Sequence, residues 1–335
     1  MMDPYARWPK VELHRHIEGS MRLGTFKELA AEAGLALPGQ TEQDVRPLIE
    51  LQDGELGRFD GFLRTFSWLR RVIRNPAALE RVTYEAIADA AAERTVYLEL
   101  RFNPGAMFLQ GMGEAEVAAA IRAAVGRGKR DFGLRAGVIG IVGRDMPADV
   151  CERTVGFCIR YFHNGIDAID LAGNEAVPPE GFAPLFQRAR QAGLPITIHA
   201  GETAGARNIV SAVRLLGAKR IGHGARLFES GEAVRCVLEE GVAIEACLTS
   251  NLHTGAVARL PDHPLRRMLA AGIPVSLNTD DPRVSRGLTL AAEYRAAVET
   301  LGISQATLQR VIQDSVEQGF LPEAKAWARE KMAFA

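Results

Sequence analysis

The sequence predicts a closed (β/α)8 barrel of the TIM type, an α/β fold. Short runs of β-branched and apolar residues, typical of buried parallel strands, recur eight times along the chain. Helical patterns separate most of these runs, and such alternation is typical of parallel α/β folds. The strand-like runs are residues 11–17, 96–102, 134–142, 166–171, 196–199, 220–223, 242–247 and 273–278.

The first run also argues against the main alternative, an open doubly wound sheet. That fold places a glycine-rich phosphate-binding turn after its first strand. Here the run leads instead into His16-Ile17-Glu18-Gly19. The sequence at this point therefore favours the closed barrel.

A long segment separates the first strand-like run from the second. It carries helical patterns at residues 25–33, 59–73 and 77–92. Because loops that follow barrel strands carry function, we expect a helical insertion at about residues 20–94 that covers the catalytic mouth.

Within this insertion, Phe59, Phe62, Leu63, Phe66 and Leu69 fall at helical spacing. The simpler interpretation is a helix that packs onto the barrel. The sharper one is that rings such as Phe62 and Phe66 line a pocket for a flat heterocycle.

The remaining strands alternate with shorter helical patterns, which often stop at a glycine such as Gly193, Gly217, Gly241 or Gly272. The segment from Leu288 onwards is also helical and is expected to close the barrel. We predict one domain over residues 1–335. The helical patterns between the later strands are residues 114–127, 148–161, 182–191, 209–216, 232–239 and 264–271.

Composition narrows the possible partners and the compartment. The 335 residues carry a formal net charge of −1, so no global field favours nucleic acid or a membrane surface. No stretch approaches the ~18 apolar residues of a membrane span, and the start lacks a signal-peptide core. The four cysteines show no CxxC spacing. We expect a cytoplasmic protein with neither nucleic-acid nor membrane partners; the sequence leaves its oligomeric state open.

Four histidine-bearing or acidic segments lie at or directly after strand-like runs. The ends of parallel strands converge in space, so these segments predict one common site. They are His14-Arg15-His16, His199-Ala200-Gly201-Glu202, Gly222-His223-Gly224 and Asn278-Thr279-Asp280-Asp281-Pro282.

The pattern indicates a metal centre. His14 and His16 are two residues apart, so on a strand both imidazoles point to the same side. With His199 and Asp280 they offer three nitrogens and one carboxylate oxygen, a set that suits Zn²⁺. We predict one zinc ion per chain, which would activate water.

Two further residues are candidates for proton chemistry. Glu202 stands near the metal without binding it and can protonate a ring nitrogen of a heterocycle; the alternative is a solvated loop carboxylate. His223 can orient the water, although a structural histidine is the plainer reading. Glu245 is predicted to hydrogen-bond His223 and fix its tautomer, with a core salt bridge as an equal alternative.

Substrate contacts are expected beside the metal. Asp281 can face substrate while Asp280 holds the ion, and an Asp-Asp-Pro turn is the alternative reading. Gly173 can offer a backbone N–H to a heterocycle nitrogen. His163, His253 and His263 match no ligand position and are predicted to be structural or exposed.

These motifs, in order over nearly the whole chain, resemble the adenosine deaminase family of metal-dependent amidohydrolases. The resemblance implies hydrolytic deamination at C6 of an aminopurine, giving a 6-oxopurine and ammonia. It also implies roles for individual residues: zinc held by His14, His16, His199 and Asp280, purine N1 protonated by Glu202, the attacking hydroxide oriented by His223, and the purine edge bound by Asp281 and Gly173.

The sequence departs from the family pattern at Glu18. Adenosine-specific members usually have Asp there, reaching the ribose hydroxyls, whereas members acting on free adenine or larger N9-substituted adenines often have Glu. One methylene moves a carboxylate by only ~1–1.5 Å, so Glu18, with His16, is still expected to contact substrate.

We therefore expect adenosine and 2′-deoxyadenosine as substrates. The alternatives are adenine, a modified adenine or 6-aminodeoxyfutalosine. A more remote alternative is an inactive nucleoside-binding protein on the same barrel.

Overall fold

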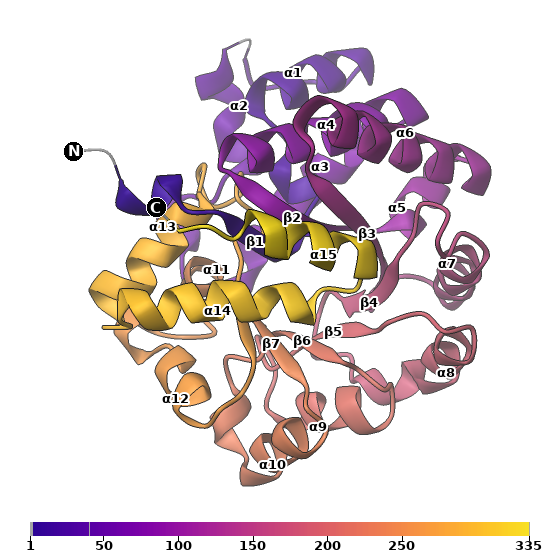
Figure 1. The fold of residues 1–335 in the computed structure, drawn as a ribbon. Coiled ribbons are helices and arrows are strands. Elements are labelled where there is room, and N and C mark those ends of the chain that lie inside the picture. The colour runs from indigo at the N-terminus through magenta and orange to yellow at the C-terminus, as the bar shows by residue number, and fades with distance from the viewer. Residues whose placement is uncertain (1–2, 40, 335) are drawn as a thin grey trace.

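The computed structural model describes residues 3–39 and 41–334 and confirms the predicted barrel (Figure 1). Its strands form two parallel four-stranded ladders, β1 to β4 and β5 to β8. Bridges at Ile169–Ile196 and Arg15–Asp280 join the ladders and close the barrel. The strands are β1 Lys10–His16, β2 Thr95–Phe102, β3 Arg135–Gly143, β4 Ala168–Ala172, β5 Thr197–Ala200, β6 Arg220–His223, β7 Ala243–Ala246 and β8 Val275–Leu277.

The insertion after β1 contains the three expected helices and one more. They are α1 Leu23–Glu32, α2 Glu42–Ile49, α3 Phe59–Val72 and α4 Pro76–Ala92. Helix α2 is short, mostly polar and contains Pro47, a residue that is disfavoured inside helices, so the sequence did not mark it as a helix. A reciprocal capping box between Thr41 and Asp44 starts it.

The helices around the barrel follow the predicted order. They are α5 Pro104–Leu109, α6 Glu114–Phe132, α7 Ala148–Arg160, α8 Ala183–Gln191, α9 Arg207–Arg214, α10 Gly231–Glu239, α11 Leu248–His253 and α12 Leu265–Ala270. The short helices α5 and α11 were not predicted. Both follow strand ends, and α11 carries side chains of the site described below.

The C-terminal helices close the amino-terminal end of the barrel, as expected. They are α13 Leu290–Arg295, which continues as a π-helical turn over Ala296–Thr300, α14 Gln305–Gln318 and α15 Pro322–Lys331. Helices α14 and α15, yellow in Figure 1, lie across the strands. They bury Val316, Ala324 and Ala328 against Val11, Leu13 and Tyr97.

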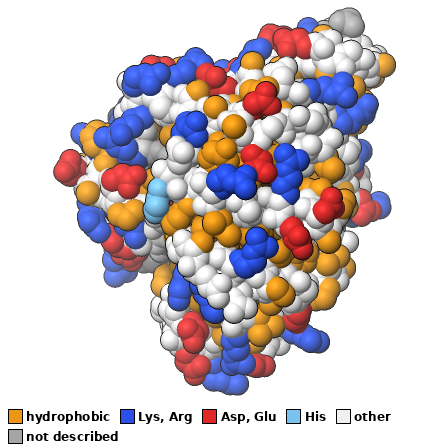
Figure 2. All heavy atoms as spheres, turned by 90° about the vertical axis from the view of Figure 1, so that its right-hand side faces the viewer, with side chains coloured by type: hydrophobic (Ala, Val, Ile, Leu, Met, Phe, Trp, Pro, Cys, Tyr) orange, Lys and Arg blue, Asp and Glu red, His pale blue; other side chains and the backbone are white. Residues whose placement is uncertain are grey.

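The surface is mixed in character. On the face that carries α6, α7 and α8, basic and acidic side chains are interspersed with hydrophobic ones (Figure 2). Among the described residues, no helix combines the length and apolar character that crossing a membrane requires. All four cysteines are free and buried.

Candidate active site

The carboxyl ends of the strands bring the predicted histidines together. His14 and His16 lie on β1, His199 on β5 and His223 at the end of β6, and all four are buried. The His14 ring centroid is 4.6 Å from that of His199 and 4.9 Å from that of His223. Residues from three distant parts of the chain thus form one cluster.

Unusual backbone conformations aim two of the side chains into this cluster. His223 has φ = 67° and Asp280, just after β8, has φ = 62°. A non-glycine residue in this left-handed region costs about 1–3 kcal/mol, and such strain concentrates at functional sites. Beside them, a Cβ on Gly222 would lie 2.9 Å from Cε1 of His14, so only glycine fits there.

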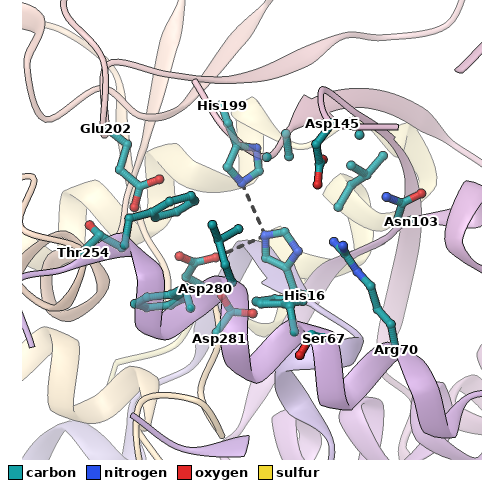
Figure 3. A pocket seen from close by; sticks show the side chains of 18 of the residues that line it. His16, Ser67, Arg70, Asn103, Asp145, His199, Glu202, Thr254, Asp280 and Asp281 are labelled. Carbon is teal, nitrogen blue, oxygen red and sulfur yellow. Dashed lines mark hydrogen bonds and ion pairs between the residues drawn. The ribbon is translucent and has the colours of Figure 1, made fainter. Parts of the chain in front are cut away.

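The nitrogen and oxygen atoms of the cluster are spaced as metal ligands would be. Oδ1 of Asp280 lies 3.2 Å from Nε2 of both His14 and His16. The Nε2 atoms of His16 and His199 are 3.3 Å apart (Figure 3). Tetrahedral ligands at ~2.0–2.1 Å from an ion lie roughly 3.3–3.4 Å from one another, so each of these three separations fits a shared ion. Among the described residues, the groups whose ligand atoms all lie within 4.8 Å of one another are His14, His199, His223 and Asp280, and His16, Asp280 and Asp281, so His223 stands as close to the cluster as His16 does.

Unsatisfied atoms support the same conclusion. Nε2 of His14 and Oδ1 of Asp280 are buried without a hydrogen-bond partner among the described residues. Buried polar atoms left without a partner are costly, and a bound cation would satisfy both. Nε2 of His223 also lies close, 3.9 Å from the other Asp280 oxygen, and that oxygen accepts a 2.7 Å bond from Ser250.

A second layer of carboxylates orients the histidine rings. Nδ1 of His14 lies 2.7 Å from Glu245, and Nδ1 of His199 lies 2.9 Å from Asp170. Each pairing leaves Nε2 free to face the cluster. Arg101 bridges both carboxylates at 2.9 and 2.8 Å.

Of the two alternatives for Glu245, the core salt bridge is confirmed and the hydrogen bond to His223 is not found among the described residues. Glu245 points from β7 into the barrel interior, where it meets His14, Arg101 and Arg220. The left-handed turn at the end of β6 directs the His223 ring elsewhere. Glu245 is therefore a second-layer residue, as predicted, but for a different histidine.

The bridging arginines keep these interior carboxylates charged. Burial opposes ionisation of Glu245, but Arg101 and Arg220 outweigh it and hold its pKa well below the ordinary range. Burial likewise opposes ionisation of Asp170, while His199 and Arg101 lower its pKa. Sequence reasoning missed Arg101 and Asp170; a charged residue inside each apolar run was the available signal.

His223 is held by a chain of hydrogen bonds that fixes its tautomer. The Leu265 N–H donates to Nδ1 of His263 at 3.2 Å, so the His263 proton must lie on Nε2. That nitrogen lies 3.1 Å from Oδ1 of Asn251, whose amide nitrogen lies 3.0 Å from Nδ1 of His223. The chain directs the Nε2–H of His223 into the site. His263 was expected to be structural or exposed, and it is a buried part of this chain.

Glu202 is positioned to donate a proton. Burial is the main cause of a pKa well above the ordinary value, and the charge of Asp280 raises it further. Its Oε2 lies 3.6 Å from Nε2 of His223. Glu175, which sequence reasoning also missed, accepts from the backbone N–H groups of Gly201, Glu202 and Ala204 at 3.0–3.1 Å and holds this loop in place.

A pocket of about 360 Å³ opens onto the cluster, within the ~300–1,000 Å³ range of small-molecule sites. Phe59, Phe62, Leu63 and Phe66 of α3 line one wall, so the insertion contributes to the pocket. The Phe66 ring lies 5.9 Å from that of His16.

All of the expected substrate contacts except Glu18 line this pocket, including His16, Phe62 and Phe66. Asp281 and Gly173 are lining residues, and burial together with Asp280 raises the pKa of Asp281. Glu18 is buried behind the lining, where its Oε1 accepts from the Asn103 N–H at 3.1 Å. The neighbouring Gly19 has no room for a Cβ, because the Asp281 carboxylate lies there.

Comparison with known proteins agrees with this geometry. A family model described as adenosine deaminase matches residues 9–331. An adenosine deaminase from Erwinia tasmaniensis is 38% identical over 98% of this chain and 99% of its own length.

Solved structures show the same fold. An adenine deaminase from Arthrobacter aurescens superposes with a TM-score of 0.88 at 29% identity, covering 97% of this chain and 98% of its own. An amidohydrolase from Burkholderia ambifaria with bound zinc superposes with a TM-score of 0.86 at 27% identity, covering 98% and 91%.

Proposed function

Since the chain belongs to the adenosine deaminase family, we propose that it removes the 6-amino group of adenosine and 2′-deoxyadenosine by hydrolysis. The products are inosine or 2′-deoxyinosine and ammonia, so the enzyme is a hydrolase acting on C–N bonds. The observation that carries the proposal is one pocket that contains a metal-ligand cluster, a buried Glu202 whose pKa is raised by burial, and a tautomer-fixed His223.

We assign the metal site to His14, His16, His199 and Asp280, with one Zn²⁺ per chain. When bound there, a zinc ion lowers the pKa of water towards ~7. The zinc-bound relative of similar fold supports this choice of metal.

The protein side chains supply the rest of the reaction. His223 holds the oxygen of the attacking water through its Nε2–H while the C6–O bond forms. Glu202, neutral in its buried site, donates its proton to purine N1. The C6–N6 bond then breaks: one proton of the water leaves with ammonia, and the other restores the proton that Glu202 gave to N1.

Other side chains bind the purine and its substituent. Asp281 and the backbone N–H of Gly173 contact the purine edge, and Phe62 and Phe66 cover its face. His16 and Glu18 stand on the substituent side. The four free cysteines support a reducing, cytoplasmic location.

A second substrate class is favoured by the position of Glu18. This carboxylate lies behind the pocket lining. A ribose in the pocket would therefore have to extend past the lining residues before its hydroxyls could hydrogen-bond to Glu18. Adenine, a modified adenine or 6-aminodeoxyfutalosine is therefore the alternative substrate, and a relative of similar fold is an adenine deaminase.

The test is turnover by zinc-loaded protein, followed as loss of 6-aminopurine absorbance, with adenosine and adenine side by side. We expect kcat/KM for adenosine to be higher by several orders of magnitude. Preference for adenine would move the assignment to the alternative class. Negligible rates with all 6-aminopurines at full zinc occupancy would refute the proposed activity.

A further inference from the structure

The pocket contains a guanidinium group without a partner. Arg70, near the end of α3, lines the pocket, yet its side chain forms no hydrogen bond or ion pair with any residue that the structure describes. Its Nε is buried and unsatisfied. Its charge acts on the Asp281 carboxyl, but no described carboxylate lies within ion-pair distance. A partly buried guanidinium that is not paired is costly, so an anionic ligand would be stabilised at this position.

Packing holds Arg70 in place. Its guanidinium carbon lies 5.2 Å from the centre of the Phe66 ring, which itself packs edge-on against His16. The Arg70 carbonyl accepts a 2.6 Å hydrogen bond from Gln110 just beyond α5. The side chain is thus oriented before any ligand binds, which lowers the entropic cost of using it.

A second unsatisfied donor lies at the same end of the pocket. Oδ1 of Asn103 accepts from the Ala106 N–H at 3.2 Å, which caps α5 and fixes the orientation of the amide. Nδ2 of Asn103 is then left buried without a partner. Gly143 keeps the space beside it open, since a Cβ there would lie 2.9 Å from Nδ2.

The position of these donors matches one end of a bound purine. Figure 3 shows Arg70, Asn103 and Asp145 at one end of the pocket and Glu202 at the other, with His16 and His199 between them. Purine N1 and C6 belong to the six-membered ring, and N9 lies at the far side of the fused ring. With N1 at Glu202, the N9 substituent points towards Arg70 and Asn103.

We propose that Arg70 and Asn103 form a subsite for an anionic group, a carboxylate or a phosphate, on the N9 substituent of the 6-aminopurine. The inference rests on the proposed deaminase function and narrows its substrate class. Two acids lie at the same end: Asp145 lines it, and the buried Glu18 accepts from the Asn103 N–H at 3.1 Å. The wall is therefore not uniformly positive, and the anion is recognised by direct contact with the two donors.

The test compares zinc-loaded wild-type and Arg70→Gln proteins on four substrates. Adenosine is neutral at N9, AMP carries a phosphate, and adenosine-5′-carboxylic acid and 6-aminodeoxyfutalosine carry carboxylates at short and longer reach. Hydrogen bonds to charged groups contribute ~1.5–3 kcal/mol. We therefore expect the ratio of kcat/KM for the best anionic substrate to that for adenosine to fall by about 10- to 100-fold in Arg70→Gln.

The matched control is Arg71→Gln. It removes one positive charge from the next position of α3, where the exposed Arg71 stacks on Trp68 at 4.6 Å, and should leave the ratio unchanged. Asp145→Asn removes the nearby negative charge and should raise it. Calorimetric titration of IMP and inosine into both arginine variants gives the same comparison without turnover.

Each outcome bears on the subsite separately from the main activity. If Arg70→Gln lowers the kcat/KM ratio for AMP alone, the subsite binds phosphate. If it lowers the ratio for the two carboxylate substrates alone, the subsite binds carboxylate. Suppose that adenosine is turned over, but the kcat/KM ratio is unchanged in Arg70→Gln or falls equally in Arg71→Gln. Either result would overturn the subsite and leave the proposed deaminase activity standing. Absence of turnover with every purine would overturn the proposed function and the subsite with it.

Discussion

Two groups of buried carboxylates differ in what surrounds them. In the barrel interior, Asp170 and Glu245 are paired with Arg101, and their pKa values lie below the ordinary range. At the mouth, Glu202 and Asp281 form no ion pair with a described arginine or lysine, and burial raises their pKa values well above it, although the Arg70 charge partly offsets the rise for Asp281.

The difference shows that burial alone does not set the protonation of a carboxyl group here. All four are buried, so the neighbouring charges decide. Asp170 and Glu245, which are paired with arginine, orient the metal-binding histidines. Glu202 and Asp281, whose pKa values are raised, are suited to hydrogen-bond a neutral heterocycle in their protonated forms. Substitutions on the two sides should therefore have different consequences.

The largest effect should come from removing Asp280, which lies between the two groups and contacts His14. Asp280→Ala should lose zinc by elemental analysis and lower turnover by at least about 10³-fold, because a metal centre supplies several kcal/mol to the reaction. Unchanged zinc content would show that another residue is the ligand.

Breaking the interior group should reduce stability. Arg101→Met leaves Asp170 and Glu245 without their shared partner, and removing one member of a buried ion pair costs about 3–5 kcal/mol. Chemical denaturation of the metal-free proteins measures this difference. Arg226→Met, which removes an exposed pair with Glu229, is the control and should cost less than about 1 kcal/mol.

A third buried acid, Glu293, allows the effect of burial on stability to be measured through its pH dependence. Glu293 is buried and accepts from the Leu248 and Thr249 N–H groups at 2.9 and 3.1 Å and from the Thr249 side chain, and burial raises its pKa to about 7. Its folded pKa exceeds the unfolded value, so its contribution is full below pH ~4.5 and is lost as pH rises towards 7, by up to about 3 kcal/mol.

Glu293→Gln should accordingly flatten the decline of unfolding free energy between pH 5 and 7. The slope is the readout, because the variant also changes one of the hydrogen bonds. An unaltered slope would mean that Glu293 is ionised in the folded protein.

At the mouth, Glu202→Gln should lower turnover by about 10²-fold, the loss expected for a general acid. Zinc content and inosine binding should persist, since only the proton donor is removed. Stability should not fall, in contrast to Arg101→Met. Near-wild-type turnover would remove Glu202 from the mechanism.

The smallest effect should come from the outermost residue of the His223 chain. His263→Leu removes the donor to Asn251 and should lower kcat by about 10-fold, the lower end for groups that orient a catalytic shell. His263→Gln keeps an N–H donor and should recover most of it. Nitrogen-15 shifts of the His223 ring report its tautomer directly; a tautomer unchanged in His263→Leu would contradict the chain.

Sequence reasoning located the barrel and the strand-end residues because both depend on local periodicity. It missed Arg101 and Asp170, since their partners come from other strands and the side-chain directions are set by the closed barrel. For the same reason it could not choose between a contact with His223 and a core salt bridge for Glu245, and it did not foresee the contact with His14. Helix α2 contains Pro47, and α5 and α11 follow almost directly on strand ends, so their residues do not stand out as separate helices; α11 carries Asn251.

The seam between β1 and β8 has a consequence for biosynthesis. His14 lies in the first strand and Asp280 follows the last, while the Gln318 carbonyl accepts a 2.9 Å hydrogen bond from Arg220, which holds Glu245 behind His14. A nascent chain still short of these residues lacks both a ligand and its support. We therefore expect metal acquisition to follow release from the ribosome, and fragments ending before Asp280 to bind zinc weakly.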